Sequence, residues 1–244
     1  MENKKIHISW NEITTTCTKL FCGIAMDLGH AEEASVAIST MEAQSGDGLK
    51  YLRKIYTKIL PIKNQTLNFV IKKPHLLVVD ANGQTIFNII EVIDFIVAHC
   101  TKHGYVLSCI YNFKHENILP YFLYKDYVMD IKLSAQILSN KFFTVIQNTQ
   151  TFNNVQVSQY SIPNSMETEK MTAIYACDSK HFNSFNFHPT KPPNYILTSG
   201  ALAQKLLFAQ TKGLAVNKET WDWVVKQSKK ILVPESDKSK SQAG

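Results

Sequence analysis

The sequence predicts an α+β fold with a three-helix unit at the N-terminus, a mostly antiparallel sheet in the middle and a helix at the C-terminus. Residues 9–60 repeat apolar side chains at helical spacing and carry residues typical of helix caps. Residues 105–177 hold short runs of β-branched and aromatic residues separated by Asn, Asp, Ser or Pro, which is typical of strands. Because the helical patterns lie at the ends and the strands between them, an α+β layout is favoured over alternating parallel units.

The chain is long enough to bury a sizeable core, because 45% of its 244 residues are hydrophobic. We expect a single domain over residues 1–244. It would consist of a helical unit (1–61), a sheet-rich body (62–216), and a C-terminal helix with a polar tail (217–244).

Three helices are expected in the N-terminal unit. Ser9 and Glu12 are spaced as a capping box, so the first helix should start at Trp10 and stop at Gly23 in a left-handed cap. The second helix begins near residues 27–29, and its stripe of small residues indicates close packing against the first. Residues 45–48 end the second helix, with Asp47 capping a third that closes at 60–61.

The middle of the chain reads mainly as strands. We expect a strand over 75–79 that enters a hairpin turn at 80–83, then a helix over 88–103, buried on most sides, with Glu91, Asp94, Ala98 and Lys102 on one face. Further strands are expected over 105–113, 121–128, 130–138, 142–147, 155–160 and 171–177. The chain is completed by three further segments: a strand or turn leading into a helix over 195–211, a final helix over 218–231, and a polar tail over 234–244.

Composition indicates a cytoplasmic protein. No stretch reads as a secretory signal or a membrane span. The five cysteines are an odd number without a CxxC pair, which indicates reduced thiols. The net charge of +6 comes from scattered lysines, and Arg53 is the single arginine, so nucleic acid is an unlikely partner.

The strong one-line motifs of cofactor and metal enzymes are absent, so we expect no nucleotide cofactor and no metal. His99 and His103 stand at the i, i+4 spacing of two metal ligands, yet histidines also suit a helix C-terminus, and both interpretations stay open. Cys177, Asp178 and His181 have the spacing of a ligand cluster in an otherwise ordinary loop.

A candidate site lies at the start of the second helix, where Asp27, His30, Glu32 and Glu33 gather. Carboxylates there are explained by the helix dipole. His30 and Glu33 nevertheless share one face, where an imidazole and a carboxylate can divide acid and base work.

These N-terminal residues carry a family resemblance. Ser9-Trp10-Asn11-Glu12, Gly23, Gly29-His30-Ala31-Glu32-Glu33-Ala34, and Asp47-Gly48 with Leu49 and Leu52 resemble the motifs of a bacterial family known as domain of unknown function 3726. The chain departs from the family pattern at Trp10 and His30. Val233-Pro234-Glu235-Ser236 with Ser239 and Lys240 resembles the family's C-terminal motif. The resemblance implies a soluble bacterial protein of one continuous domain and brings no known activity.

Two hypotheses for the function follow. The first is a cytoplasmic enzyme, or enzyme subunit, of small-molecule metabolism, of hydrolase or lyase type, acting on a polar metabolite without a nucleotide cofactor. Glu33 and Glu12 would be its acid or base, and the substrate contacts would be Asn11, His30, Ser236, Ser239 and Lys240, with the tail folded over a cleft near Glu33. The second is a noncatalytic binding or assembly protein with a homo-oligomer or partner interface.

Overall fold

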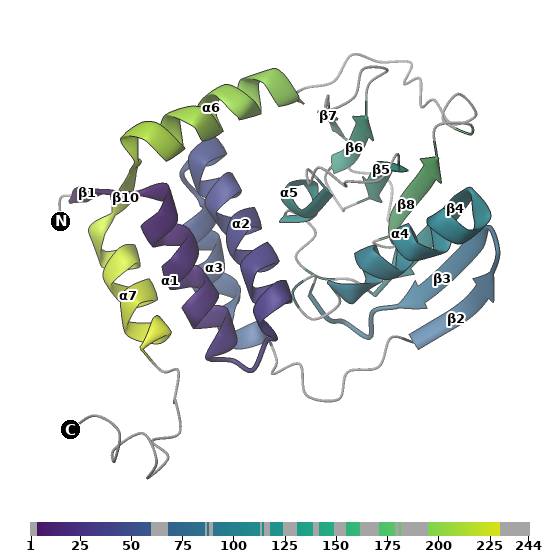
Figure 1. Ribbon diagram of the computed structural model, residues 1–244, viewed down its shortest axis with the longest axis horizontal. Coiled ribbons are helices and arrows are strands. Elements are labelled where there is room, and N and C mark those ends of the chain that lie inside the picture. The colour runs from purple at the N-terminus through teal and green to yellow at the C-terminus, as the bar shows by residue number, and fades with distance from the viewer. Residues whose placement is uncertain are drawn as a thin grey trace, which may run out of the picture. The chain divides into compact units, whose positions relative to one another are not determined.

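The computed structural model describes residues 4–59, 68–85, 87, 90–112, 114, 118–123, 131–138, 142–148, 155–161, 171–178, 181 and 195–229. The chain divides into two compact units (Figure 1): unit 1 comprises Met1–Lys63 with Phe208–Gly244, and unit 2 comprises Asn64–Leu207. The predicted α+β class is confirmed. A single domain over 1–244 stays a prediction, and each unit is described by itself.

Unit 1 is built from helices and one short ribbon. Its elements are β1 (Lys5–Ile8), α1 (Trp10–Cys22), α2 (Leu28–Ser45), α3 (Gly48–Ile55), the 3-10 turn η1 (Tyr56–Lys58), β10 (Leu214–Asn217) and α7 (Lys218–Ser228). Strands β1 and β10 pair antiparallel, with Ile6 opposite Val216. Helix α7 packs on both α1 and α3 (Figure 1), so the predicted three-helix unit is completed by a helix from the far end of the chain.

Helices α1 and α2 approach closely, as the small residues of α2 predict. Ala31, Ala34 and Ala37 of α2 are buried, and hydroxyl groups bridge the two helices. Thr14 Oγ1 donates to Ser39 Oγ and Thr18 Oγ1 donates to Ser35 Oγ, both at 3.1 Å. These paired hydroxyls satisfy polar groups that would otherwise be costly to bury.

The helix ends confirm one predicted cap and correct two. Ser9 Oγ accepts the Glu12 N–H at 3.2 Å, as expected. Gly23 follows α1, but its φ of −65° is right-handed, and Ala25 takes the left-handed conformation instead, at φ 66°. Asp47 makes no side-chain cap on α3. That role falls to the buried Glu42, whose Oε2 accepts the Leu49 N–H at 2.8 Å.

Unit 2 contains an eight-stranded sheet in the order β2-β3-β4-β8-β5-β6-β7-β9. The strands are β2 (Asn68–Lys73), β3 (Leu76–Asp80), β4 (Tyr105–Tyr111), β5 (Ile131–Leu138), β6 (Phe142–Asn148), β7 (Val155–Ser161), β8 (Met171–Asp178) and β9 (Tyr195–Thr198). Strands β3 and β4 pair parallel and the other neighbours antiparallel, so the predicted mostly antiparallel sheet is confirmed.

Helix α4 (Glu91–His103) connects the two parallel strands and covers one face of the sheet (Figure 1). Its buried side is Val92, Ile93, Ile96 and Cys100, which packs toward β4 and β8. Glu91, Asp94, Ala98 and Lys102, the residues predicted to share one face, are all exposed. Helix α6 (Ser199–Lys212) carries the chain from unit 2 into unit 1.

One predicted strand and one predicted hairpin are wrong. The strand expected over 121–128 overlaps helix α5 (Leu119–Leu123), where Leu119 and Phe122 are buried at helical spacing. Asn82 (φ 49°) and Gly83 (φ 74°) do make the predicted tight turn after β3, closed by the Gln84 N–H on Ala81 O at 2.8 Å. No hairpin follows it, because β3 pairs antiparallel with the preceding β2 and the chain continues into α4.

The helices in the described ranges are all too short or too polar to cross a bilayer.

Candidate functional site

The site predicted in unit 1 is partly assembled. Asp27 Oδ1 accepts the His30 backbone N–H at 3.1 Å and so caps α2, and the His30 imidazole Nδ1 contacts Asp27 Oδ2. Burial alone would raise the pKa of Asp27, but its bonds to the His30 backbone and imidazole outweigh it and lower that pKa. The carboxylate partner of His30 in this pair is therefore Asp27.

The other predicted site residues are more dispersed. Glu33 is half-buried on α2, whereas Asn11 and Glu12 are exposed on the first turn of α1. Their roles in a site, and that of His30, stay predictions. Ser236, Ser239 and Lys240 lie outside the described residues, so the docking of the tail is also still a prediction.

Unit 2 holds a carboxylate–imidazole pair at the end of β8. His181 Nδ1 donates to Asp178 Oδ1 at 2.7 Å, and the backbone N–H of His181 donates to the same oxygen at 3.1 Å. With Nδ1 committed as the donor, the neutral imidazole has its lone pair on Nε2. Both side chains are partly open to solvent, at 39% for His181 and 34% for Asp178. This geometry suits a general base that is oriented by a carboxylate.

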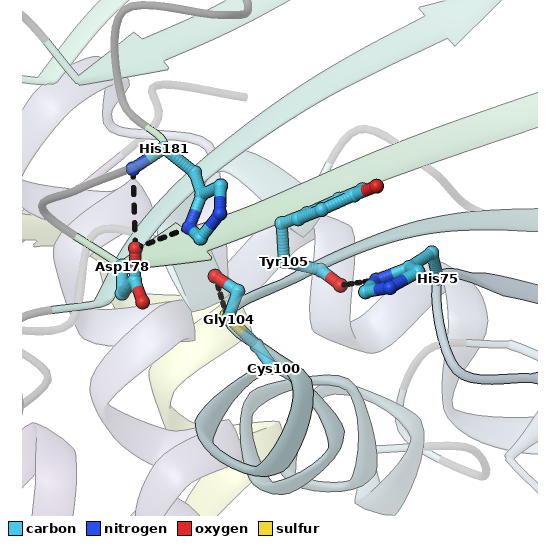
Figure 2. A network of polar contacts seen from close by, with 6 residues as sticks. All are labelled: His75, Cys100, Gly104, Tyr105, Asp178 and His181. Atoms are coloured by element: carbon cyan, nitrogen blue, oxygen red, sulfur yellow. Dashed lines mark hydrogen bonds and ion pairs between the residues drawn. The ribbon is translucent and has the colours of Figure 1, made fainter.

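Gly104, which follows α4, holds this pair in place (Figure 2). Its carbonyl accepts the Asp178 N–H at 2.9 Å, and its own N–H donates to Cys100 O at 2.7 Å. It is left-handed at φ +85°, and a Cβ at this position would lie 2.9 Å from His181 Cε1 and 3.2 Å from His181 Nδ1. The absence of a side chain at residue 104 therefore makes room for the imidazole.

Aromatic side chains form a wall beside the pair (Figure 2). The Tyr105 ring lies 5.1 Å from the His181 ring and stacks on His75 at 4.0 Å, with an interplanar angle of 11°. Burial, followed by the neighbouring Cys177, Tyr105, Cys100 and Asp178, raises the pKa of Tyr175 to about 12. Tyr175 therefore keeps its phenolic proton at neutral pH and remains a hydrogen-bond donor.

His99 and His103 lie in contact on α4, with ring centroids 4.6 Å apart, and His75 lies 6.1 Å from His103. Within the described ranges, no three His, Cys, Asp or Glu side chains converge as a metal site.

The sequence contained one signal for this second site. Asp178 and His181 have the spacing of a cluster, but nothing local marks it as more than a loop. The register of the sheet places Tyr105 opposite Cys177, so that β4 and the preceding Gly104 meet the end of β8. A contact between residues so distant in the chain cannot be read from spacing.

Comparison with solved structures shows the fold. The chain is similar to malate dehydrogenase from Entamoeba histolytica, at a TM-score of 0.67 and 8% identity, over 93% of this chain and 98% of that one. It is similar to sulfolactate dehydrogenase from Methanocaldococcus jannaschii, at 0.62 and 8%, over 92% and 97%. It is also similar to delta1-piperideine-2-carboxylate reductase from Pseudomonas syringae pvar. tomato, at 0.55 and 5%, over 91% and 99%.

Sequence comparison supports the expected family resemblance. None of the curated proteins matches the sequence. Residues 8–85, which include the capping box, the small-residue helix and the Asp47-Gly48 corner, match a family model. Over these residues the chain resembles the family described as Protein of unknown function (DUF3726).

Proposed function

We propose that the protein is a cytoplasmic enzyme, or enzyme subunit, of small-molecule metabolism, in which Asp178 and His181 handle a proton of a small polar substrate. The observation that carries the proposal is the 2.7 Å bond that fixes the His181 imidazole with Nε2 as its proton acceptor. The five cysteines form no disulfide in the part of the chain that the structure describes, which supports a reducing compartment.

We infer the type of reaction from the solved structures whose fold is similar. Their names are those of dehydrogenases and a reductase, and malate and sulfolactate are hydroxy acids. A dehydrogenase type therefore replaces the hydrolase or lyase type expected from the sequence. In the proton step, Nε2 of His181 takes the proton of a substrate hydroxyl, the O–H electron pair stays on the oxygen, and Asp178 stabilises the imidazolium.

A dinucleotide acceptor for such a reaction would use the free N–H groups of a helix N-terminus to bind its pyrophosphate. Five described helices do not fit that role. Four of them are already capped by side chains of the protein: α1 by Ser9, α2 by Asp27, α3 by Glu42 and α7 by Asn217. The first turn of the fifth, α4, carries the carboxylates of Glu91 and Asp94. Oxidation of a hydroxyl also needs a hydride acceptor, so the proposal covers the proton step alone and we derive no step through a cofactor.

The carboxylate of a hydroxy acid is commonly held by the planar fork of an arginine. Arg53 is the single arginine of the chain, and its Nη1 is paired with Glu219 Oε1 at 2.9 Å in unit 1. A lysine or a neutral donor would have to bind such a carboxylate here. A neutral polyol or amide substrate therefore belongs in the screen beside the hydroxy and oxo acids.

A thermal-shift screen tests the proposal. The wild type is screened against hydroxy acids, oxo acids, polyols and amides, and each hit is repeated with His181→Asn and Glu33→Gln. Asparagine keeps a donor for Asp178 but removes Nε2, so the hit should be lost or weakened in His181→Asn and unchanged in Glu33→Gln. The reverse pattern would place the site at the start of α2, and hits insensitive to His181→Asn would refute its role.

Exposed apolar side chains support a second candidate, the assembly protein. Leu28 and Leu207 are 62% exposed and Phe208 is 61% exposed, and Leu207 and Phe208 are consecutive residues of α6. Exposed apolar side chains that adjoin one another are typical of interaction surfaces. We expect Phe208→Lys to lower the molar mass measured by light scattering if these residues join copies of the chain. A monomeric wild type over a range of concentrations would remove this candidate.

A further inference from the structure

A ladder of rings runs along the C-terminal end of α4 and the start of β4. Its members, in contact order, are Tyr105, His75, His103, His99 and Phe95, and we call this set the imidazole ladder. The ring centroids of neighbours are 4.0, 6.1, 4.6 and 5.7 Å apart. Three of the eight histidines of the chain therefore touch one another on a single surface.

Two of the three imidazoles are tied to the backbone and one is held by ring contacts. His75 Nδ1 donates to Tyr105 O and His99 Nε2 donates to Lys73 O, both at 3.0 Å. The nitrogen in each bond already carries its proton, so a second proton leaves both bonds intact. Within the described ranges, His103 has no hydrogen bond to its imidazole, and it is the member most easily expelled.

The charged groups around the ladder are mainly positive. Lys102 neighbours His103 on α4, Lys73 and Lys72 lie on β2, and Lys72 Nζ sits 4.7 Å above the Phe95 ring. The carboxylates of α4, Glu91 and Asp94, lie in its first turn. Asp94 directly precedes the ladder's Phe95, and both carboxylates are at the other end of the helix from His103. Asp178 reaches the ladder through His181, to which it is already bound.

Partial removal from water and the neighbouring charges both act on the protonation of His103. Desolvation, followed by His99, Lys102 and His75, lowers the pKa of His103. A helix C-terminus normally favours an imidazolium, so here desolvation, together with the neighbouring positive groups, outweighs the helix dipole. Because the ring of His103 lies 4.6 Å from that of His99 and 6.1 Å from that of His75, an imidazolium at His103 would be held close to any further positive charge on the ladder, so the ladder favours a neutral His103.

The ladder adjoins the Asp178–His181 pair through the next residue. Gly104 follows His103 directly, and its left-handed backbone makes the bonds to Cys100 O and from the Asp178 N–H. The ring of Tyr105, the next residue, stacks on His75 and also contacts the His181 ring. A displacement of His103 is therefore transmitted to the backbone that holds Asp178.

We propose that the imidazole ladder is a pH-sensitive latch, which holds the end of α4 and the Asp178–His181 pair in place while its imidazoles are neutral and releases them in acid. Only the effect of the latch on catalysis rests on the proposed function, because that function makes His181 the base. Its existence is tested without any substrate.

The sign of the effect follows from proton binding. An open state, with His103 in water, has the ordinary histidine pKa of about 6.5 and binds protons more readily than the latched state. The latch is therefore fully closed above that value and weakens as the pH falls through it toward the lowered pKa of His103.

Hydrogen exchange of the full chain between about pH 5 and pH 8 measures the latch, with protection factors corrected for the intrinsic pH dependence of exchange. The reporters are the N–H groups of Gly104 and Asp178. The reference is the Ala81 N–H, which bonds to Tyr111 O at 2.9 Å at the other end of β4. In the wild type, acid should lower the protection of the reporters about threefold or more relative to the reference.

The variant His103→Gln cannot ionise and should remove most of that acid response, whereas the matched control His7→Gln, on β1 of unit 1, should keep it. An equal response in wild type and His103→Gln, or an equal loss at Gly104 and Ala81, would overturn the latch. If His103→Gln folds poorly, the titration of the His103 imidazole in the wild type tests the latch instead. An apparent pKa of His103 at or above the ordinary histidine value would overturn the latch. Neither result depends on the thermal-shift outcome for His181→Asn.

Discussion

Replacing Gly104 with alanine tests the packing on which the Asp178–His181 pair depends. The added methyl would lie 2.9 Å from His181 Cε1, against an ordinary contact of at least 3.4 Å, so the imidazole must move by about 0.5 Å. Gly83→Ala is the matched control, because its φ of +74° is similar and its Cβ would meet only the flexible end of Lys114, with Nζ at 3.2 Å.

Both variants place an alanine at positive φ, which costs roughly 1–2 kcal/mol in the left-handed helical region. The ψ of −37° at Gly104 lies outside that region, so its backbone cost is at least as large. Gly104→Ala also disturbs the 2.7 Å bond between His181 and Asp178. A hydrogen bond to a charged group is worth about 1.5–3 kcal/mol. Both side chains are more than a third exposed, at 39% and 34%, so screening by solvent reduces the contribution of this hydrogen bond to about 1 kcal/mol. Gly104→Ala should therefore be about 1 kcal/mol less stable than Gly83→Ala.

Urea unfolding of both variants measures the difference, and the imidazole resonances of His181 report the movement directly. We expect a lower midpoint and shifted His181 resonances in Gly104→Ala alone. Equal midpoints with unchanged His181 resonances would show that the glycine is not needed to make room for the imidazole.

Three further outcomes are expected. Gly48→Ala should destabilise the protein by about 3 kcal/mol or more in urea, because its Cβ would lie 2.3 Å from the rigid carbonyl of Ile38; a change below about 1 kcal/mol would contradict this contact. Ser108→Ala should raise the stability by roughly 1 kcal/mol, since the buried Ser108 hydroxyl has no hydrogen-bond partner among the residues that the structure describes; a loss of stability on calorimetry would imply one. Burial raises the pKa of Glu42, so its ionisation costs stability as the pH rises above about 4. Glu42→Gln should unfold at higher urea than wild type at neutral pH, with the gap closing below about pH 4, and a gap independent of pH would refute that cost.

The predicted features that the structure confirms are local ones. The Ser9 cap is set by a residue three positions away, and the small residues of α2 predict its packing on α1 because they lie on one helical face. Asp47 looked like the equivalent cap for α3, yet the carboxylate of Glu42 reaches Leu49 across the turn. Glu42 could do so because Gly48 brings α3 against the backbone of α2.

The candidate site of unit 2 depends on contacts that spacing does not encode. Asp178 and His181 are three residues apart and were visible as a pair, but Gly104 and Tyr105 join them only through the register between β4 and β8. The pairing of β1 with β10 is likewise set by the fold, since its partners come from opposite ends of the chain. Long-range pairing of this kind has no counterpart in hydrophobic periodicity.

The imidazole resonances of His181 test the central claim most directly. A long-range proton–nitrogen spectrum of the wild type should show the proton on Nδ1 and the lone pair on Nε2, as the bond to Asp178 requires. Adding a ligand identified by the thermal-shift screen should then move the Nε2 resonance more than those of His7 and His30. A proton on Nε2 in the free protein, or a bound ligand that leaves the His181 resonances unchanged, would contradict a proton-transfer role for this pair.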